Sequence, residues 1–296
     1  MASKKKKPSK LKSLSSGRPP TAKPTRSISS KATRTLIRAH HTLEKQKAKA
    51  IADGDEAEAA LIAKQIESKG GLKTYQKASL QGQSNERGGD SSRILMDWLA
   101  PIVPPLKEKL QSGIPARMLE VGALSTTNAC SKSHLFDIER IDLNSQSEGI
   151  RQQDFMERPL PSGPEECFDI ISLSLVLNYV PDPASKGAML LRVLQFLKTK
   201  PDSENDPVQE FLPSLFLVLP APCVMNSRYM DERKLEAIMK ALGFVQVKKK
   251  LSNKLIYYLW RLEPSVGVNM EKKMFGFKKE ELRSGKDRNN FAIVLK

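Results

Sequence analysis

Cysteine is scarce in this sequence of 296 residues, and acidic residues are nearly missing from its first 50 positions. The three cysteines, Cys130, Cys167 and Cys223, lie far apart without a Cys-x-x-Cys or Cys/His spacing, which excludes a disulfide framework and disfavours a zinc site. No apolar run reaches the ~18–20 residues of a bilayer-spanning helix, and no apolar segment follows the N-terminal charges as in a secretory signal. We therefore expect a protein of a reducing compartment, the cytosol or nucleus, with no membrane and no metal.

The net charge of +16 is concentrated at the N-terminus. Residues 1–50 contain 15 Lys or Arg and one acid, Glu44, whereas the rest of the chain is almost balanced, with 34 basic and 32 acidic groups. Low hydrophobicity and like charge predict a disordered basic arm over residues 1–30. The run Lys4–Lys7, followed by Pro8, fits a nuclear-import cluster or a nucleic-acid contact, and a solubility tail is the alternative.

Residues 31–71 have the composition of a helical hairpin. Asp53-Gly54-Asp55 interrupts the helical pattern, and Gly70-Gly71 ends it. In the second helix, apolar residues at helical spacing predict a buried stripe; they are Ala57, Leu61, Ile62 and Ile66. The first helix carries basic residues that are either a solvated face or contacts to phosphates; they are Arg34, Arg38, Lys45, Lys47 and Lys49.

We assign residues 72–296 to one domain that begins with a polar linker over residues 72–90. Beyond Pro115, short runs rich in Ile, Leu and Val alternate with helical segments, as buried parallel strands do. The expected strands are residues 118–122, 140–143, 168–173, 215–219, 244–247, 256–262 and 291–295, and the expected amphipathic helix is 231–242. This pattern predicts an α/β doubly wound sheet with an antiparallel end.

One ordered series of residues carries the chemistry. Gly122, just after Glu120 at the end of the first strand, allows a close turn under a cofactor, and Asp142 lies 20 residues further on. At that distance a doubly wound sheet places a carboxylate on ribose hydroxyls. Asp154 and Phe155, at the end of an expected third strand, suit the amine and the face of an adenine ring. The alternative is that Gly122 is only a turn and Asp142 only a surface acid.

The glycines that a dinucleotide pyrophosphate requires are missing from residues 120–125, where Ala123 and Leu124 follow Gly122. A nicotinamide cofactor is therefore disfavoured. A nucleoside that bears methionine has no phosphate to bind and tolerates these residues. The spacings are similar to those of S-adenosylmethionine-dependent methyltransferases of the Rossmann-like class. The segment 168–183 resembles their Val-Leu-His-His-Val-Pro-Asp stretch, with Asn178-Tyr179 in place of the two histidines.

Further motifs closely resemble the fungal 25S ribosomal RNA adenine-N1-methyltransferase family. They are Tyr75-Gln76, Leu80–Gly82, Arg87–Arg93, Leu119–Gly122, Ile141–Asn144, Gln153–Phe155 and Ser172–Pro181. The resemblance covers about residues 60–296, and Arg-Gly-Gly-Asp-Ser-Ser is not a general methyltransferase motif. It implies a Rossmann-like class I methyltransferase sheet with antiparallel final strands, S-adenosylmethionine as cofactor, and methylation of one adenine of large-subunit ribosomal RNA during ribosome biogenesis.

The same resemblance implies the site and the setting. Matched residue by residue, Gly122 and Asp142 are cofactor ligands, and the matched motifs add Arg87, Leu173 and Ser174 as cofactor contacts beside Glu120, Asp154 and Phe155. The partners would be large-subunit ribosomal RNA or pre-ribosomal particles in the nucleus and nucleolus. Animal relatives of the family look like S-adenosylmethionine sensors, so a sensor or scaffold without transferase activity is the competing hypothesis. The basic arm favours an RNA-modifying protein over the sensor.

The chemistry expected at adenine N1 needs no strong base. N1 carries an in-plane lone pair and no proton, so catalysis is expected to be mostly the positioning of two reactants. N1 also lies on the Watson–Crick edge, so the base must be unpaired or flipped out. Asn178 and Tyr179 are the candidate catalytic residues, because they could hydrogen-bond and stack on such a base; alternatively they cap the strand and pack under the next helix.

Overall fold

The computed structural model describes residues 30–71, 74, 89–145, 147–199, 207–263 and 276–296. The expected disordered arm lies outside the described residues, apart from residue 30, and so does most of the linker 72–90. Within the described ranges, no helix is long and apolar enough to cross a membrane. The division into arm, hairpin and domain stays a prediction.

One sheet of seven strands has the order β3-β2-β1-β4-β5-β7-β6. The strands are β1 (Ala116–Val121), β2 (Phe136–Asp142), β3 (Arg151–Gln152), β4 (Ile170–Ser174), β5 (Ser214–Pro220), β6 (Phe244–Leu251) and β7 (Leu255–Leu262). Strands β1 to β5 pair in parallel, whereas β7 is antiparallel to both β5 and β6. The α/β sheet with antiparallel final strands is therefore confirmed. Its order reverses between β1 and β4, where open α/β sheets bind ligands beyond the carboxyl ends of the strands.

The central strands β1, β4 and β5 form where the sequence is apolar on both faces. In β5 the first six residues are all buried, and β1 is buried at five of six positions. The strand expected at 140–143 begins earlier, at Phe136, because charged side chains hide its start from an apolar pattern. Asp137 and Glu139 lie 3.6 and 3.9 Å from the guanidinium of Arg117 on the neighbouring strand.

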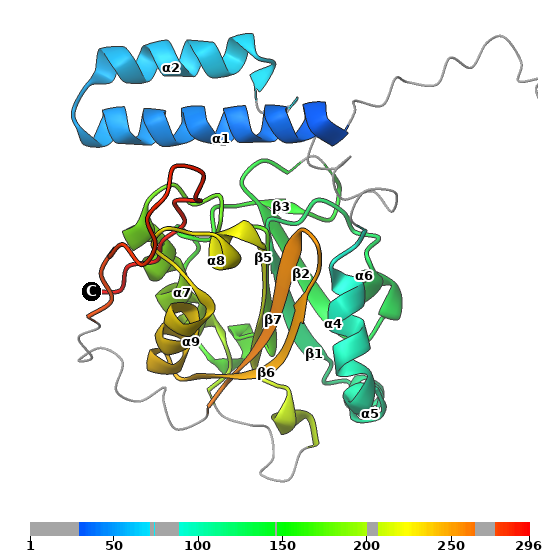
Figure 1. The fold of residues 1–296 in the computed structure, drawn as a ribbon. Helices are drawn as coiled ribbons and strands as arrows, with labels where there is room; N and C mark the ends of the chain where they lie inside the picture. The colour runs from blue at the N-terminus through cyan, green and yellow to red at the C-terminus, as the bar shows by residue number, and fades with distance from the viewer. Residues whose placement is uncertain (1–29, 72–73, 75–88, 146, 200–206, 264–275) are drawn as a thin grey trace, which may run out of the picture.

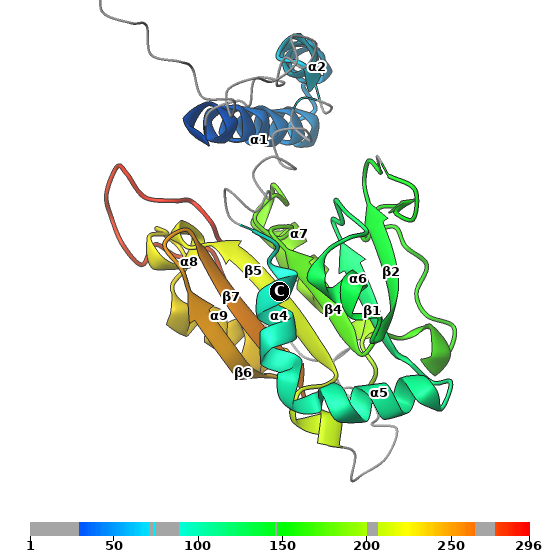
Figure 2. The ribbon, with the colours of Figure 1, turned by 90° about the vertical axis from the view of Figure 1, so that its right-hand side faces the viewer.

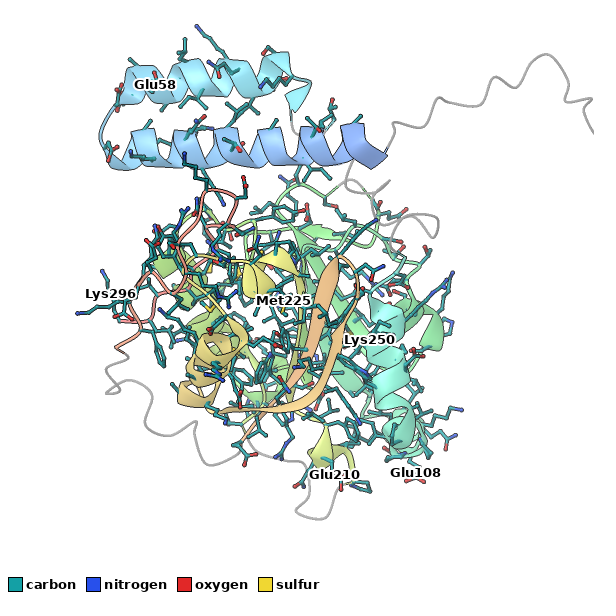
Figure 3. The ribbon with its side chains drawn as sticks, viewed as in Figure 1. Glu58, Glu108, Glu210, Met225, Lys250 and Lys296 are labelled. Carbon is teal, nitrogen blue, oxygen red and sulfur yellow. The ribbon has the colours of Figure 1, made fainter. Side chains whose placement is uncertain are left out.

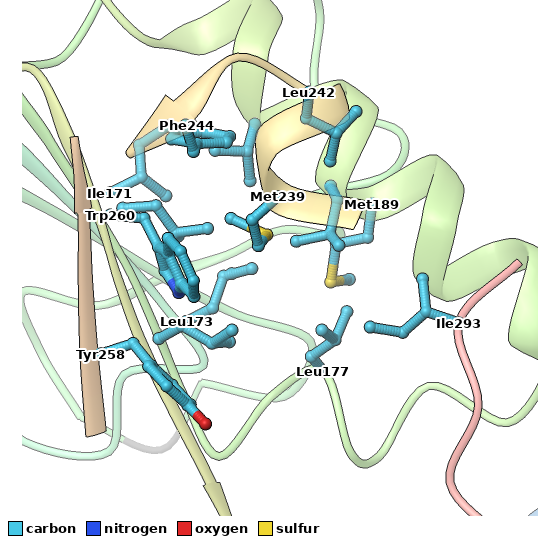
Figure 4. Close-up of a cluster of buried hydrophobic side chains, with 14 of the residues drawn as sticks. Ile171, Leu173, Leu177, Met189, Met239, Leu242, Phe244, Tyr258, Trp260 and Ile293 are labelled. Carbon is cyan, nitrogen blue, oxygen red and sulfur yellow. The ribbon is translucent and has the colours of Figure 1, made fainter. Parts of the chain in front are cut away.

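Helices cover both faces of the sheet (Figures 1 and 2). On one face lie α7 (Pro183–Phe196), α8 (Pro222–Met225) and α9 (Glu232–Ala241), and on the other α4 (Ser92–Leu99), α5 (Val103–Gln111) and α6 (Ala129–Ser133). Figure 4 shows the core under α7 and α9, where Trp260, Met239 and Leu173 meet. The opposite core packs Leu99 of α4 against Met118 and Phe216. Strands β1, β4, β5 and β7 therefore contribute alternate residues to two separate cores.

The prediction of a strand at residues 291–295 is wrong. This segment joins the sheet nowhere and forms a single bridge between Leu295 and Phe277. Phe291, Ile293 and Leu295 are buried at alternate positions, which imitates a strand, but they pack in the core under α7 and α9. The backbone N–H of Val294 donates to the carbonyl of Pro183 at 2.9 Å, so the C-terminal segment is fastened to the start of α7.

The residues expected to form the helical hairpin contain α1 (Ser30–Ala52) and α2 (Glu56–Ser68). Asp55 caps α2 by accepting the N–H of Glu58 at 2.9 Å. The buried face of α2 is Ala59, Ile62 and Ile66, so two members of the expected stripe are correct. Leu61 is 52% exposed and Ala57 is exposed, because the buried face of α2 runs through Ala59, Ile62 and Ile66. The hairpin lies above the edge of the sheet near α7 and α8 (Figures 1 and 2). Glu108 of α5 lies at the opposite end of the molecule (Figure 3).

The attachment of the C-terminal segment to α7 gives a stability prediction. A Cβ at Gly187 would overlap the backbone carbonyl of Val294, which cannot rotate away. Gly to Ala inside a helix normally stabilises by about 1 kcal/mol, but here overpacking should win, and Gly187→Ala should lower the free energy of unfolding by about 1–3 kcal/mol. Urea denaturation measures it, with Gly276→Ala as the control, because nothing lies within 4 Å of a Cβ at Gly276. A Gly187→Ala protein as stable as the wild type would contradict this packing.

Candidate functional site

A cavity of about 350 Å³ opens at the carboxyl ends of β1 and β4, where the strand order reverses. Three segments line it. Residues 90–93 precede and begin α4, residues 120–128 run from the end of β1 towards α6, and Ser172 and Ser174 belong to β4. Lys132 of α6 completes the wall. A cavity of this size is in the range of small-molecule sites.

Gly122 forms the turn at the end of β1. Its φ is +72°, and an ideal Cβ would lie 2.6 Å from Cγ2 of Val176. The N–H groups of Gly122 and Ala123 both donate to the carbonyl of Ile141, at 2.8 and 3.1 Å, so the turn is tied to β2. Glycine adopts this backbone without strain and leaves room that any other side chain would fill. The structure places Gly122 in the cavity wall, and its contact with a cofactor stays a prediction.

Asp90 and Ser92 fasten α4 to α6 beside the cavity. The carboxylate of Asp90 accepts hydrogen bonds from the Ser92 N–H at 2.9 Å and hydroxyl at 2.6 Å, and from the Ala129 N–H at 2.6 Å. The Ser92 oxygen accepts the N–H groups of Ala129 and Cys130 at 2.9 and 3.3 Å. Ser92 is 6% exposed, so these polar groups are satisfied inside the protein. We call these bonds the Asp90–Ser92 clamp.

Glu120 is a buried acid in the same wall, with 6% of its surface exposed. The amide of Asn128 donates to Oε1 at 2.7 Å, and the guanidinium Nε of Arg140 lies 3.4 Å from Oε2. Oε2 has no hydrogen-bond partner among the residues that the structure describes. Burial raises the pKa of Glu120, and Asn128 and Arg140 oppose that rise. Asn128 and Arg140 therefore hold this acid within the wall.

Asp142 ends β2 beside this turn. Val121 pairs with Ile141 in the parallel register, so Gly122 and Asp142 are the next residues of their strands and share one edge of the sheet. Oδ1 of Asp142 accepts the N–H of Asn144 at 2.8 Å, and burial is the main cause that raises the pKa of this half-buried carboxyl. The side chain lies outside the lining of the cavity, at its β2 side.

The structure does not bring every expected contact to the cavity. The ring of Phe155 is 3% exposed and packs on Phe196 with ring centroids 5.4 Å apart, so its face belongs to the core. Leu173 is fully buried in the same core. Asp154 turns the chain after β3 by accepting the N–H of Met156 at 2.7 Å. Arg87 lies outside the described residues.

The end of β4 carries the remaining expected residues. The hydroxyl oxygens of Ser174 and Ser91 are 2.8 Å apart, which joins β4 to the loop before α4. Leu175 follows with φ +60°, a conformation that costs a non-glycine residue energy and that clusters at functional sites. Two residues beyond the adjacent Val176, the buried Oδ1 of Asn178 has no hydrogen-bond partner within the described part of the chain.

Several lining residues were not nominated from the sequence. They are Asp90, Arg93, Asn128, Lys132 and Ser172. Ser172 was signalled by the Ser172–Pro181 motif, and Asp90 and Arg93 by the Arg87–Arg93 motif, whose place beside β1 depends on tertiary contacts with α6. Within the described ranges, no group of three His, Cys, Asp or Glu side chains could hold a metal ion.

The strand order, the antiparallel pair at one end and the crevice at the Gly122 turn define a Rossmann-like class I methyltransferase fold. The profile of the family described as 25S rRNA (adenine(2142)-N(1))-methyltransferase, Bmt2, matches residues 60–293. The chain belongs to this family.

Two relatives extend over most of the chain. It is 41% identical over 262 residues to the 25S rRNA adenine-N(1) methyltransferase of Schizosaccharomyces pombe, which covers 87% of this chain and 89% of the relative. It is 39% identical over 235 residues to the 25S rRNA (adenine(2142)-N(1))-methyltransferase of Saccharomyces cerevisiae, which covers 79% of this chain but 63% of that relative. Among solved structures, the Burkholderia thailandensis 1,6-didemethyltoxoflavin-N1-methyltransferase is similar at 13% identity and a TM-score of 0.38, over 64% of this chain and 87% of that one.

The Asp90–Ser92 clamp gives a prediction about stability. Asp90→Ala removes an acceptor of three hydrogen bonds and should cost about 1–3 kcal/mol, because the buried Ser92 donors lose their partner. Asp97→Ala, at an exposed position of the same helix, is the matched control and should change stability little. Thermal unfolding of the two variants compares them. Equal melting temperatures would show that the clamp does not hold α4 to α6.

Proposed function

We propose that this protein transfers the methyl group of S-adenosylmethionine to N1 of an adenine in 25S ribosomal RNA. The observation that carries the proposal is the crevice at the Gly122 turn, in a chain that belongs to a family named for this reaction. The relatives with that name are about 40% identical over most of this chain.

The residues around the cavity suit S-adenosylmethionine. The Gly122 turn, where a Cβ would meet Val176, lies in the cavity wall, and Asp142 offers a carboxylate to ribose hydroxyls at the same edge. Glu120 supplies negative charge to the wall beside an ammonium group, and the exposed Arg93 and Lys132 carry the charge that a carboxylate needs. The wall therefore offers groups of suitable charge to both the zwitterionic amino-acid end and the ribose of S-adenosylmethionine. When bound, S-adenosylmethionine supplies an electrophilic methyl group on a sulfonium.

The protein has to present the adenine rather than activate it. N1 is already a nucleophile, so holding the lone pair in line with the methyl group supplies most of the rate. The target must leave its base pair, since N1 lies on the Watson–Crick edge. Asn178, three residues beyond the strained Leu175, is the residue that we propose for this task. Its buried, unpartnered Oδ1 would accept the 6-amino group of the base, and Tyr179 would stack on the ring.

The cellular setting follows from the substrate. Ribosomal RNA is made and modified in the nucleolus, and we propose that the protein works there on large-subunit RNA or on pre-ribosomal particles. The basic residues 1–50 would supply import and non-specific affinity for RNA.

A transfer assay tests the function. The protein is incubated with methyl-labelled S-adenosylmethionine and with 25S ribosomal RNA stripped of proteins. We expect label in the RNA, with N1-methyladenosine as the labelled nucleoside. Binding of S-adenosylmethionine without transfer to either stripped RNA or large-subunit particles would favour the sensor instead.

Asp142→Ala is predicted to weaken S-adenosylmethionine binding, because the ribose hydroxyls lose their acceptor. The expected cost is about 1–3 kcal/mol, measured by titration calorimetry. Asp137→Ala is the control, since it removes a carboxylate from the same strand at a side chain 61% exposed. Unchanged affinity in folded Asp142→Ala protein would reject the placement of the ribose.

Asn178→Ala is predicted to slow the methyl-transfer step, whereas Asn178→Asp should retain most of the rate because it keeps an acceptor oxygen. A lost hydrogen bond of about 1–3 kcal/mol corresponds to roughly 5- to 150-fold. Single-turnover rates with saturating RNA separate this effect from binding. Equal loss in both variants, or none in either, would assign Asn178 a structural role only.

A further inference from the structure

Lys186 lies on the buried face of α7, whose other members are apolar. The buried residues of this helix are Lys186, Gly187, Met189, Leu190, Val193 and Phe196. Lys186 is 3% exposed, and among the residues that the structure describes no carboxylate forms an ion pair with its ammonium. A buried charge without an opposite charge is costly, and an apolar residue of similar size packs without that cost. Packing alone therefore does not explain a lysine at this position.

The ammonium of Lys186 reaches the chain that connects β4 to α7. We call this connection, residues 175–182, the base loop, because it carries Asn178 and Tyr179. The ammonium donates to the carbonyls of Pro181 and Asp182 at 3.4 and 3.5 Å. The Asp182 carbonyl also accepts the backbone N–H of Lys186 at 3.2 Å, and Pro181 is exposed to solvent. These carbonyls therefore have other partners open to them, and the ammonium is not needed merely to satisfy them.

The C-terminal segment holds the ammonium from the other side. The ring centre of Phe291 lies 5.5 Å from Nζ of Lys186, within the range in which an aromatic face attracts a cation. Phe291 is buried, and its carbonyl accepts the hydroxyl of Ser227 at 2.6 Å. The N–H of Val294 donates to the carbonyl of Pro183 at 2.9 Å. The ammonium is thus placed between the end of the base loop and a ring that is itself anchored.

The base loop is also held at its start and in its middle. The N–H of Leu175 donates to the carbonyl of Val218 on β5 at 2.9 Å. Leu177 points into the core toward Ile293 of the C-terminal segment (Figure 4). Lys186 adds the attachment at the far end, beyond Asn178. A reactant displaced by about 1 Å loses much of the benefit of positioning, so the far end of the loop matters for the reaction.

We propose that Lys186 is a positioning residue, whose ammonium holds the end of the base loop against Phe291 and thereby fixes Asn178 where the target adenine is received. Lys186 is buried and acts through the loop rather than on the substrate. The effect on methyl transfer rests on the proposed function, whereas the attachment of the loop is a property of the folded protein and is tested without it.

Hydrogen–deuterium exchange of the base loop tests the attachment in Lys186→Met protein. The Tyr179 amide, which donates to the Val176 carbonyl at 2.8 Å, is the reporter within the peptides that cover residues 175–182. We expect its exchange to accelerate about 10-fold, the factor that corresponds to one lost hydrogen bond from a charged donor. Stability in urea should stay equal or rise, because methionine suits the apolar face.

The consequence for catalysis is measured in the same variant. Single-turnover methyl transfer at saturating S-adenosylmethionine and RNA should slow by about 10-fold. The affinities for both ligands should stay unchanged, because Lys186 touches neither. A loss of rate without a loss of affinity or stability distinguishes positioning from a role in folding.

Two further variants control for packing. Val193→Ala opens a cavity on the same buried face of α7, where Val193 is fully buried. It should lower stability and leave loop exchange and transfer rate unchanged. Phe291→Leu leaves Lys186 in place but removes the ring behind its ammonium, and it should accelerate loop exchange by about 3-fold. This second variant tests the same contact independently of how Lys186→Met folds.

The outcomes separate this inference from the proposed function. Faster loop exchange in the Lys186 and Phe291 variants but not in Val193→Ala supports the attachment, even if the wild type transfers no methyl group. Exchange equal to the wild type in both variants overturns it, even if methylation proceeds normally. Equal acceleration in all three variants also overturns it, because it would reflect lost core packing. Faster exchange with an unchanged transfer rate would overturn the role in positioning.

Discussion

The hydrogen bonds that Asp90 and Ser92 accept from the start of α6 hold the candidate site together. One carboxylate and one hydroxyl join α4 to the chain that leaves β1, and the neighbouring Ser91 reaches Ser174 at the end of β4. Three segments far apart in the sequence thereby meet around one cavity. The polar groups of the clamp are satisfied by each other, and the neighbouring Glu120 is held by Asn128 and Arg140.

The proposed chemistry depends on positioning the adenine against the methyl group, and backbone features of the fold provide this positioning. Gly122 is held in a left-handed turn against Val176, and Leu175 is held in one on the adjacent strand. The strain at Leu175 persists only where the surroundings determine it. The segment beyond Leu175 leads to Lys186 and the C-terminal segment, so the region proposed to receive the base is supported from behind by α7. Methylation of adenine N1 depends on such a rigid scaffold more than on a strong acid or base, because N1 is already a nucleophile.

The sequence predicted what depends on local pattern and on the rules of parallel sheets. Gly122 and Asp142 lie on one edge because the carboxyl ends of neighbouring parallel strands share it. Phe155 was misjudged because the sequence does not tell which face of the chain meets the core, and the ring packs on Phe196. Residues 291–295 are all apolar, as in a buried strand, yet Phe291, Ile293 and Leu295 pack in the core under helices. The Asp90–Ser92 clamp could not be predicted, since its partners at Ala129 and Cys130 come from tertiary packing.

The most direct measurement of the central claim is mass spectrometry of nucleosides from 25S ribosomal RNA of cells with and without this protein. The account predicts that N1-methyladenosine falls in the cells without it, and that the wild-type protein restores the nucleoside while the Asp142→Ala protein restores less. An unchanged amount of N1-methyladenosine in the absence of the protein would contradict the account and favour a cofactor-binding protein without this activity.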